Sequence, residues 1–236
     1  MFRSSSINRS LPALPPRQNE RGFSLIELLV VLAIMGIIAG IGIPSIMSVM
    51  NSGAMNQTAV EVEGTLEQAR QYAVAQNTHV WVAFNTKTQN GINILTIAVV
   101  ASNDGTDPTT SNTIFPVPSS AFSVVSKIRT FKQVQLINAG TFTATQVHSL
   151  PATPATGTAN DLADSATSAS FSLQIPGEAS ATNFPKSVEF TPSGQARNGA
   201  NPIDVIEFAL QSVPNAKNIA VLRLNGLTGQ TRVYRS

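Results

Sequence analysis

Apolar and polar positions divide the chain into an apolar run, an amphipathic stretch and an alternating region. The run, FSLIELLVVLAIMGIIAGIGI at residues 23–43, is apolar except for Ser24 and Glu27. A helix of this length measures roughly 31 Å, which matches a hydrocarbon core of about 30 Å. We therefore predict a membrane-spanning helix over residues 23–44. A buried helix in a soluble domain is the alternative.

After Pro44 the pattern becomes amphipathic. An apolar residue recurs at helical spacing at Val62, Leu66, Ala69 and Ala73. This spacing predicts that residues 45–78 continue the same helix to about Asn77, with Gly64 as a mild defect in it. Its apolar stripe should pack on a sheet, because most helical stability comes from tertiary packing.

From residue 79 onward the period changes to two, which favours β-strands. Residues 79–84 and 92–101 should pair antiparallel across a turn at 85–91. Further strands are predicted at 123–129, 134–137, 171–175, 187–191, 205–210, 220–224 and 231–234. Residues 143–170 are rich in Ala, Thr, Ser and Pro, which predicts a long surface loop or a disordered insertion. The fold class is thus α+β, with a long N-terminal helix packed on an antiparallel β-sheet within residues 79–236.

Composition and charge narrow the possible functions. Charged residues make up 12% of the chain, about half of the ~25% of an average soluble protein, which excludes a charge-rich tail or an ionic coiled coil. The absence of cysteine excludes disulfides, thiolate zinc sites and thiol nucleophiles. Four arginines in the first 21 residues account for the net charge of +2. Their position before the apolar run places the N-terminus in the cytoplasm.

Glu27 is the one charge inside the apolar run. A carboxylate at the centre of a bilayer costs about 2.5–3.5 kcal/mol, so Glu27 needs a partner. Arg21 is one candidate, and a free amino group created by cleavage is the other. Gly36 and Gly40 form a GxxxG pattern that permits close helix–helix contact, and a merely flexible helix before Pro44 is an equal alternative.

One stretch resembles the prepilin signature of type IV pilins and type II secretion pseudopilins: Arg21-Gly22-Phe23-Ser24-Leu25-Ile26-Glu27-Leu28-Leu29-Val30-Val31. The resemblance implies that residues 1–22 are a leader, cut after Gly22 by a prepilin peptidase, and that Phe23 becomes N-methylated. It places Glu27 at the family's acidic position, where a neighbouring subunit's amino group at Phe23 could neutralise it. Pro44 corresponds to a helix-perturbing proline that many members carry.

Weaker similarity points to the GspH/FimT-like minor pseudopilins. It lies in Leu66-Glu-Gln-Ala-Arg-Gln-Tyr-Ala73, Val188-Glu-Phe-Thr-Pro-Ser-Gly194 and Leu227-Thr-Gly-Gln-Thr-Arg-Val-Tyr-Arg235. We interpret the chain as a minor pilin or pseudopilin with a pilin-like fold, and a major pilin is the alternative. The expected partners are other pilin or pseudopilin subunits, the prepilin peptidase, the inner-membrane assembly platform and the lipid bilayer. The expected location is the bacterial inner membrane, with the C-terminal domain in the periplasm, and the pilus or pseudopilus after assembly.

Candidate catalytic chemistry is sparse. His79 and His148 are the only histidines, and no HExxH, GxSxG or P-loop motif occurs. We predict no enzyme activity and no cofactor, and we favour a structural role for His79 beside Trp81. Asp104 and Asp107 could offer oxygen ligands to Ca²⁺, but an ordinary Asp-Gly turn is the favoured interpretation, so no metal site is predicted.

Basic residues near the C-terminus suggest one more partner. They are Lys217, Arg223, Arg232 and Arg235. Such a patch could neutralise DNA phosphates with strong salt dependence, and some FimT-like proteins are implicated in DNA uptake. Lysine and arginine also serve to protect sheet edges. A DNA-binding uptake subunit is therefore the less favoured alternative, which a salt titration of DNA binding by the protein would test.

Overall fold

The computed structural model describes residues 24–108, 119–142, 146–151, 159–164, 168–199, 203–213 and 216–236; side chains are not described for residues 40–52, 141, 159 and 160. The chain divides into two compact units, Met1–Ile46 and Met47–Ser236. One helix, α1 (Leu25–Gln76), extends from the first unit into the second. The strands all belong to the second unit.

The end of α1 is determined by one asparagine. Asn77 adopts a left-handed backbone conformation with φ of 50°, and the N–H of Thr78 donates to the carbonyl of Ala73 at 3.1 Å. This is the hydrogen bond of a Schellman motif, in which asparagine takes the place of the more usual glycine. The helix therefore ends at Gln76, one residue before the predicted end.

Within the described residues of the second unit, most strands form two sheets. Sheet 1 has the order β10-β9-β1-β2-β3, and β4 also pairs with β2. Its strands are β1 (Val80–Gln89), β2 (Ile92–Ser102), β3 (Phe122–Val124), β4 (Arg129–Lys132), β9 (Lys186–Phe190) and β10 (Ala196–Arg197). All of these pairs are antiparallel.

Sheet 2 has the order β13-β12-β11-β5, and β6 pairs with β11 in parallel. Its strands are β5 (Val134–Ile137), β6 (Ala159–Asp161), β11 (Val205–Ser212), β12 (Ile219–Asn225) and β13 (Thr231–Arg235). A separate hairpin joins β7 (Phe171–Leu173) to β8 (Thr182–Phe184), and a short 3-10 helix, η1, spans Ala139–Thr141. The predicted α+β architecture, a helix packed on antiparallel sheets, is confirmed, although the strands form two main sheets rather than one.

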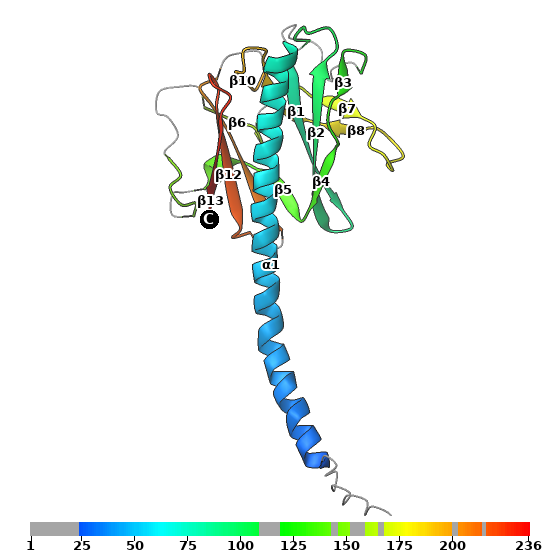
Figure 1. Ribbon diagram of the computed structural model, residues 1–236, viewed down its shortest axis with the longest axis vertical. Coiled ribbons are helices and arrows are strands. Elements are labelled where there is room, and N and C mark those ends of the chain that lie inside the picture. Colours follow the sequence, from blue (N-terminus) through cyan, green and yellow to red (C-terminus); the bar gives the residue numbers. More distant parts are fainter. Residues whose placement is uncertain are drawn as a thin grey trace, which may run out of the picture. The chain divides into compact units, whose positions relative to one another are not determined.

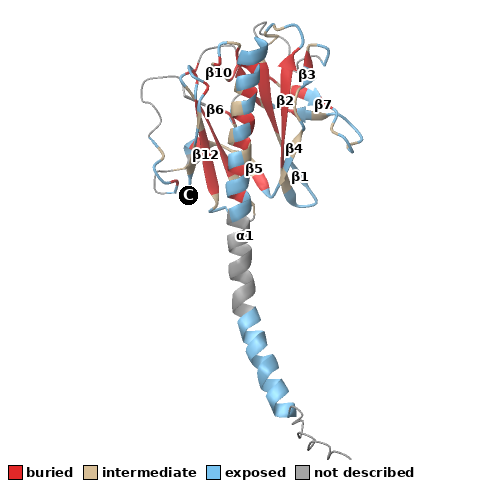
Figure 2. Cartoon of the chain, in the orientation of Figure 1, coloured by how far each residue is buried: buried red, intermediate tan, exposed pale blue. Residues whose placement is uncertain are grey.

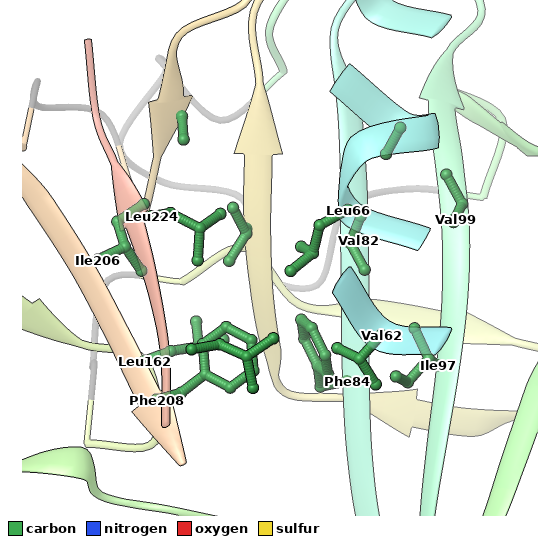
Figure 3. Packing of buried hydrophobic residues seen from close by; sticks show 14 of the residues in the cluster. Val62, Leu66, Val82, Phe84, Ile97, Val99, Leu162, Ile206, Phe208 and Leu224 are labelled. Carbon is green, nitrogen blue, oxygen red and sulfur yellow. The ribbon is translucent and has the colours of Figure 1, made fainter. Parts of the chain in front are cut away.

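The main core lies between α1 and both sheets. The predicted apolar stripe of α1, Val62, Leu66, Ala69 and Ala73, is buried, together with Met55 and Ala59. Figure 3 shows Val62 and Leu66 facing Val82 and Phe84 of sheet 1. Phe84 also meets Phe208 of sheet 2, with ring centroids 5.3 Å apart. In Figure 1 this part of α1 crosses in front of the two sheets.

Two smaller cores cover the outer faces of the sheets. Trp81 and Ala83 of β1 pack with Phe171 and Phe184 of the β7–β8 hairpin, whereas Val221 of β12 packs with residues such as Ala139 and Val147. Both faces of β1 are therefore buried along residues 80–84. This explains why the strand is continuously apolar there rather than strictly alternating.

The prediction of a turn over residues 85–91 was wrong. Residues 85–89 continue β1, and the turn consists of Asn90 and Gly91, with φ of 51° and 74°. The last part of β1 is exposed on both faces, so its polar residues resembled a loop. The Asn-Gly pair was the available signal, because two-residue hairpin turns need positive φ at both central positions.

Two other regions also differ from the prediction. The strand predicted at 123–129 is two strands, β3 and β4, separated at residues 125–128. The region 143–170, predicted to be a loop with little to bury, contains β6 and the fully buried side chains of Val147 and Leu162. These residues fill spaces beside sheet 2. Each is an isolated apolar residue in a largely polar segment, so the sequence pattern did not predict its burial.

Candidate functional site

The N-terminal part of α1 carries the residues predicted to direct assembly. Gly22 and Phe23, the predicted cleavage and methylation site, lie outside the described residues. The helix starts just after them: the carbonyl of Ser24 accepts hydrogen bonds from the N–H groups of Glu27 at 3.0 Å and Leu28 at 3.1 Å. Glu27 thus lies in the first turn, where a negative side chain interacts favourably with the helix dipole.

An extended apolar surface surrounds this first part of the helix. Every residue from 24 to 39 is exposed, which Figure 2 shows as continuous pale blue. The large apolar side chains include Leu25, Ile26, Leu29, Met35, Ile37 and Ile38. Soluble monomers rarely expose a contiguous apolar surface of this kind, and such a surface marks an interaction site. Over the residues that the structure describes, no helix is both long enough and apolar enough to cross a membrane.

The predicted helix-contact residues lie within α1. A Cβ added at Gly36 would meet no atom within 4 Å, so the space beside this glycine is open in the isolated chain. Gly40 and Pro44 also belong to the helix, which continues through the proline, but their surroundings lie outside the described side chains. A role for these three residues in helix packing stays a prediction.

The three segments that resemble the minor pseudopilins, residues 66–73, 188–194 and 227–235, meet around Arg70. The guanidinium of Arg70 binds Glu67 through two hydrogen bonds of 2.9 and 2.7 Å, which lower the pKa of Glu67. A Cβ added at Gly229 would lie 2.7 Å from Cδ of Arg70 and 2.3 Å from the carbonyl oxygen of Gly194. Both glycines have positive φ. The helix end and two glycine turns therefore form one closely packed junction.

A second cluster contains His79. Nδ1 of His79 lies 2.6 Å from Oε1 of Glu189, and the ring of His79 stacks on Trp81 with centroids 6.1 Å apart. Asp107 completes the group, because ligand atoms of all three residues lie within 4.8 Å of one another. Burial raises the pKa of Glu189, and the Asp107 carboxylate raises it further, whereas the hydrogen bond from His79 lowers it.

Asp104 has a local role in the same loop. Its Oδ1 accepts hydrogen bonds from the hydroxyl and the N–H of Thr106 at 2.7 and 2.9 Å, and from the hydroxyl of Ser102 at 2.9 Å. These bonds lower the pKa of Asp104 to about 2. Asp104 thus stabilises the turn, as the Asp-Gly interpretation expects, and Asp107 is the loop carboxylate that joins the His79 cluster.

The four basic candidates for DNA binding have different environments. Arg223 is largely buried, forms an ion pair of 2.9 Å with Glu207 and donates to the carbonyl of Pro151 at 3.0 Å. Arg232 lies opposite Arg223 in the β12–β13 pair and is exposed, as are Lys217 and Arg235. Because the charge of Arg223 is already compensated, it offers little to a phosphate.

Glu189 is the functional candidate that sequence reasoning missed. It lies in β9 between the buried residues Val188 and Phe190, and its own side chain is 2% exposed. The available signal was a carboxylate in the middle of an apolar strand. A buried carboxylate needs a partner, and the sequence alone could not indicate which residue it was.

Comparison with known families identifies one segment. The family model described as "Prokaryotic N-terminal methylation motif" matches residues 17–43. No curated protein and no solved structure matches the chain. The motif implies processing by prepilin peptidase, anchoring in the inner membrane and assembly with other pilins, and it suggests a structural subunit rather than an enzyme. The chain thus carries, over residues 17–43, the methylation motif that is typical of the type IV pilin and type II secretion pseudopilin superfamily, with Glu27 inside an exposed apolar helix.

Proposed function

We propose that this protein is a GspH/FimT-like minor pilin or pseudopilin that assembles into a type IV pilus or a type II secretion pseudopilus through its N-terminal helix. The peptidase cleaves between Gly22 and Phe23, and Phe23 is then N-methylated. Before assembly, residues 23–44 span the inner membrane with the N-terminus in the cytoplasm and residues 45–236 in the periplasm. The observation that carries the proposal is the exposed apolar surface of residues 24–39, which lies within the segment that the methylation motif matches.

Glu27 supplies the specificity of this assembly. Apolar helices can slide along one another with little change in contact energy, so burial alone does not determine their axial position. A charged carboxylate away from water is costly, and a nearby cation offsets that cost. The amino group of Phe23 in a neighbouring subunit provides that cation at one axial position, which determines the register between subunits.

The junction around Arg70 supports the minor-pseudopilin branch. The three stretches that resemble this branch are far apart in the sequence, yet Arg70, Gly194 and Gly229 lie in contact. Residues that share a packing site have a common physical reason to occur together. The three similar stretches therefore form one shared packing site, which supports the resemblance more than three unconnected short matches would.

Intact-mass spectrometry of the protein from native membranes tests the processing step. We expect a chain that begins at Phe23 and carries the additional mass of one methyl group. A Gly22→Val variant should retain the leader and its full mass. A wild-type chain that begins before Gly22 would contradict the proposal.

Incorporation of Glu27 variants tests the assembly step. We expect Glu27→Ala and Glu27→Leu to insert in the membrane at the normal level but to be lost from sheared pili or isolated pseudopili. Glu63→Ala is the matched control, because it removes an acid from α1 outside the apolar segment. Normal incorporation of both Glu27 variants would exclude the pairing.

Quantitative proteomics of the assembled fibre distinguishes a minor from a major subunit. We expect far fewer copies of this chain than of the most abundant pilin in the fibre. Equal or greater abundance would establish a major pilin, and the assembly mechanism would remain the same.

A further inference from the structure

Three potential metal ligands, which are far apart in the sequence, meet at one end of sheet 1. His79 immediately precedes β1, Glu189 lies on β9 opposite Trp81, and Asp107 lies in the loop after β2. The N–H of Ser102 donates to the carbonyl of His79 at 2.9 Å, which brings the start of that loop beside His79. The antiparallel register of β1 with β9 brings Glu189 to the same end of the sheet.

The environment of Glu189 favours a bound cation. Its side chain is 2% exposed, and Oε2 is buried without a hydrogen-bond partner in the described structure. A buried carboxylate oxygen without a partner is costly, and a second carboxylate, Asp107, lies nearby. Arg197 lies opposite Glu189 on β10, and its positive charge lowers the pKa of Glu189 less than His79 does. A metal ion would satisfy the oxygen and neutralise the two carboxylates together.

The ligand types select a class of metal. One imidazole nitrogen and two carboxylate oxygens suit a borderline divalent ion such as Zn²⁺ better than Ca²⁺ or Mg²⁺, which prefer oxygen ligands alone. Bonds of about 2.1 Å in a tetrahedral site place ligand atoms about 3.4 Å apart. The ligand atoms are at most 4.8 Å apart, and the shortest His79–Glu189 distance is 2.6 Å, so shifts of about an ångström would form the site.

We propose that His79, Asp107 and Glu189 form a binding site for a borderline divalent transition-metal ion of the Zn²⁺ class. The ion connects the loop after β2 to strands β1 and β9. Asp104 prepares the loop for this role, because its hydrogen bonds to Thr106 stabilise the turn just before Asp107. The side chain of His79 is 16% exposed, so the proposed site lies near the protein surface.

Trp81 provides a direct probe of this site. It is the only tryptophan of the chain, and its ring stacks on His79. Co²⁺ quenches indole fluorescence at short range, so the full chain, purified in detergent and freed of metal with EDTA, should lose fluorescence as Co²⁺ is added. We expect saturation at one ion per chain. Zn²⁺ should reverse the quenching, because it binds N/O sites more tightly than Co²⁺, whereas Mg²⁺ should not.

Thermal unfolding gives an independent measurement. A Zn²⁺ concentration 100 times the dissociation constant should raise Tm by about 5–10 °C. Glu189→Gln and Asp107→Asn keep the size of each side chain but should weaken binding at least about 100-fold and abolish the Tm shift. His148→Gln is the matched control, because it removes the other histidine, which is exposed.

Each result decides the proposal. Saturable quenching that is lost in Glu189→Gln and retained in His148→Gln establishes the site. Absence of quenching up to millimolar Co²⁺ would overturn it and leave an ordinary His79–Glu189 ion pair. Equal affinity in wild type, Glu189→Gln and Asp107→Asn would overturn it as well, since the ion would then bind elsewhere. Glu189→Gln removes a buried charge and keeps a hydrogen-bonding group, so the folded variant remains available for this comparison.

Discussion

Two glycines after β12 occupy positions where no side chain fits. A Cβ at Gly226 would lie 1.5 Å from the carbonyl oxygen of Ile203. At Gly229, a left-handed φ of 66° is combined with a distance of 2.3 Å to the carbonyl oxygen of Gly194. Because both neighbouring atoms belong to the backbone, a side chain could be accommodated only by moving one chain segment away from the other. The contact at Gly226 holds the β12–β13 turn against the segment that precedes β11, and the contact at Gly229 holds it against the turn that precedes β10.

We predict that Gly229→Ala lowers the free energy of unfolding by about 2–4 kcal/mol, through left-handed strain and overpacking. Gly91→Ala is the matched control, because φ is 74° there and no atom lies within 4 Å of the added Cβ. The Gly91→Ala variant should lower the free energy of unfolding through left-handed strain alone, by about 1–2 kcal/mol. Urea denaturation of both variants measures the difference, and equal losses would show that the contact with Gly194 is unimportant.

Asp104 gives a prediction of pH dependence. Its folded pKa of about 2 is below the ordinary 3.8, so its carboxylate stabilises the folded state above about pH 4. This contribution is lost as the pH falls toward 2, where the carboxylate becomes protonated. The difference in Tm between wild type and Asp104→Asn should therefore be greatest above pH 4 and decrease toward pH 2. A difference that does not change with pH would exclude the role of the charge.

At the scale of elements, α1 tolerates a residue of poor helix propensity in its interior. Gly64 lies in its interior, on the exposed side, and a Cβ added there would meet no atom. The buried stripe around it, from Met55 to Ala73, compensates for the poor helix propensity of glycine.

Gly64→Ala should therefore stabilise the protein by about 0.5–1 kcal/mol, because alanine loses less backbone entropy in a helix. Gln68→Gly, at an exposed position one turn later, should destabilise it by a similar amount. Chemical denaturation followed by Trp81 fluorescence measures both changes. Loss of stability in Gly64→Ala would indicate that this helix face has a contact that the isolated chain does not show.

The elements also show which local signals predict structure. The helix stripe and strands such as β11 and β12 followed their apolar patterns, because each buries at least one continuous face. The hairpin end of β1 did not, because it is exposed on both faces and its polar residues do not alternate. The short strands β6 and β8 were missed because three residues gain strand geometry only from their partners.

At the scale of the whole second unit, one aromatic pair connects the two sheets. Phe84 of sheet 1 is fully buried against Phe208 of sheet 2, and both belong to the core that includes α1. Removal of either ring would leave a cavity at the place where the two sheets and the helix meet. The stability of the whole unit should therefore depend on this contact.

We predict that Phe84→Ala lowers the free energy of unfolding by about 3–5 kcal/mol. Leu227→Ala, which removes an exposed side chain, should change it by less than about 0.5 kcal/mol. Equilibrium unfolding in urea gives both values. A small effect of Phe84→Ala would mean that the two sheets are held together mainly by other contacts.

The sequence by itself determined the methylation motif, the α+β class and the buried stripe of α1. These features depend on neighbours in the chain: the methylation motif is contiguous, and helical periodicity repeats within a few residues. Only the tertiary structure decided the division into two sheets, the junction around Arg70, and the meeting of Asp107 and Glu189 with His79. These contacts join residues that are far apart in the chain, and their positions depend on strand order and register, which local spacing does not encode.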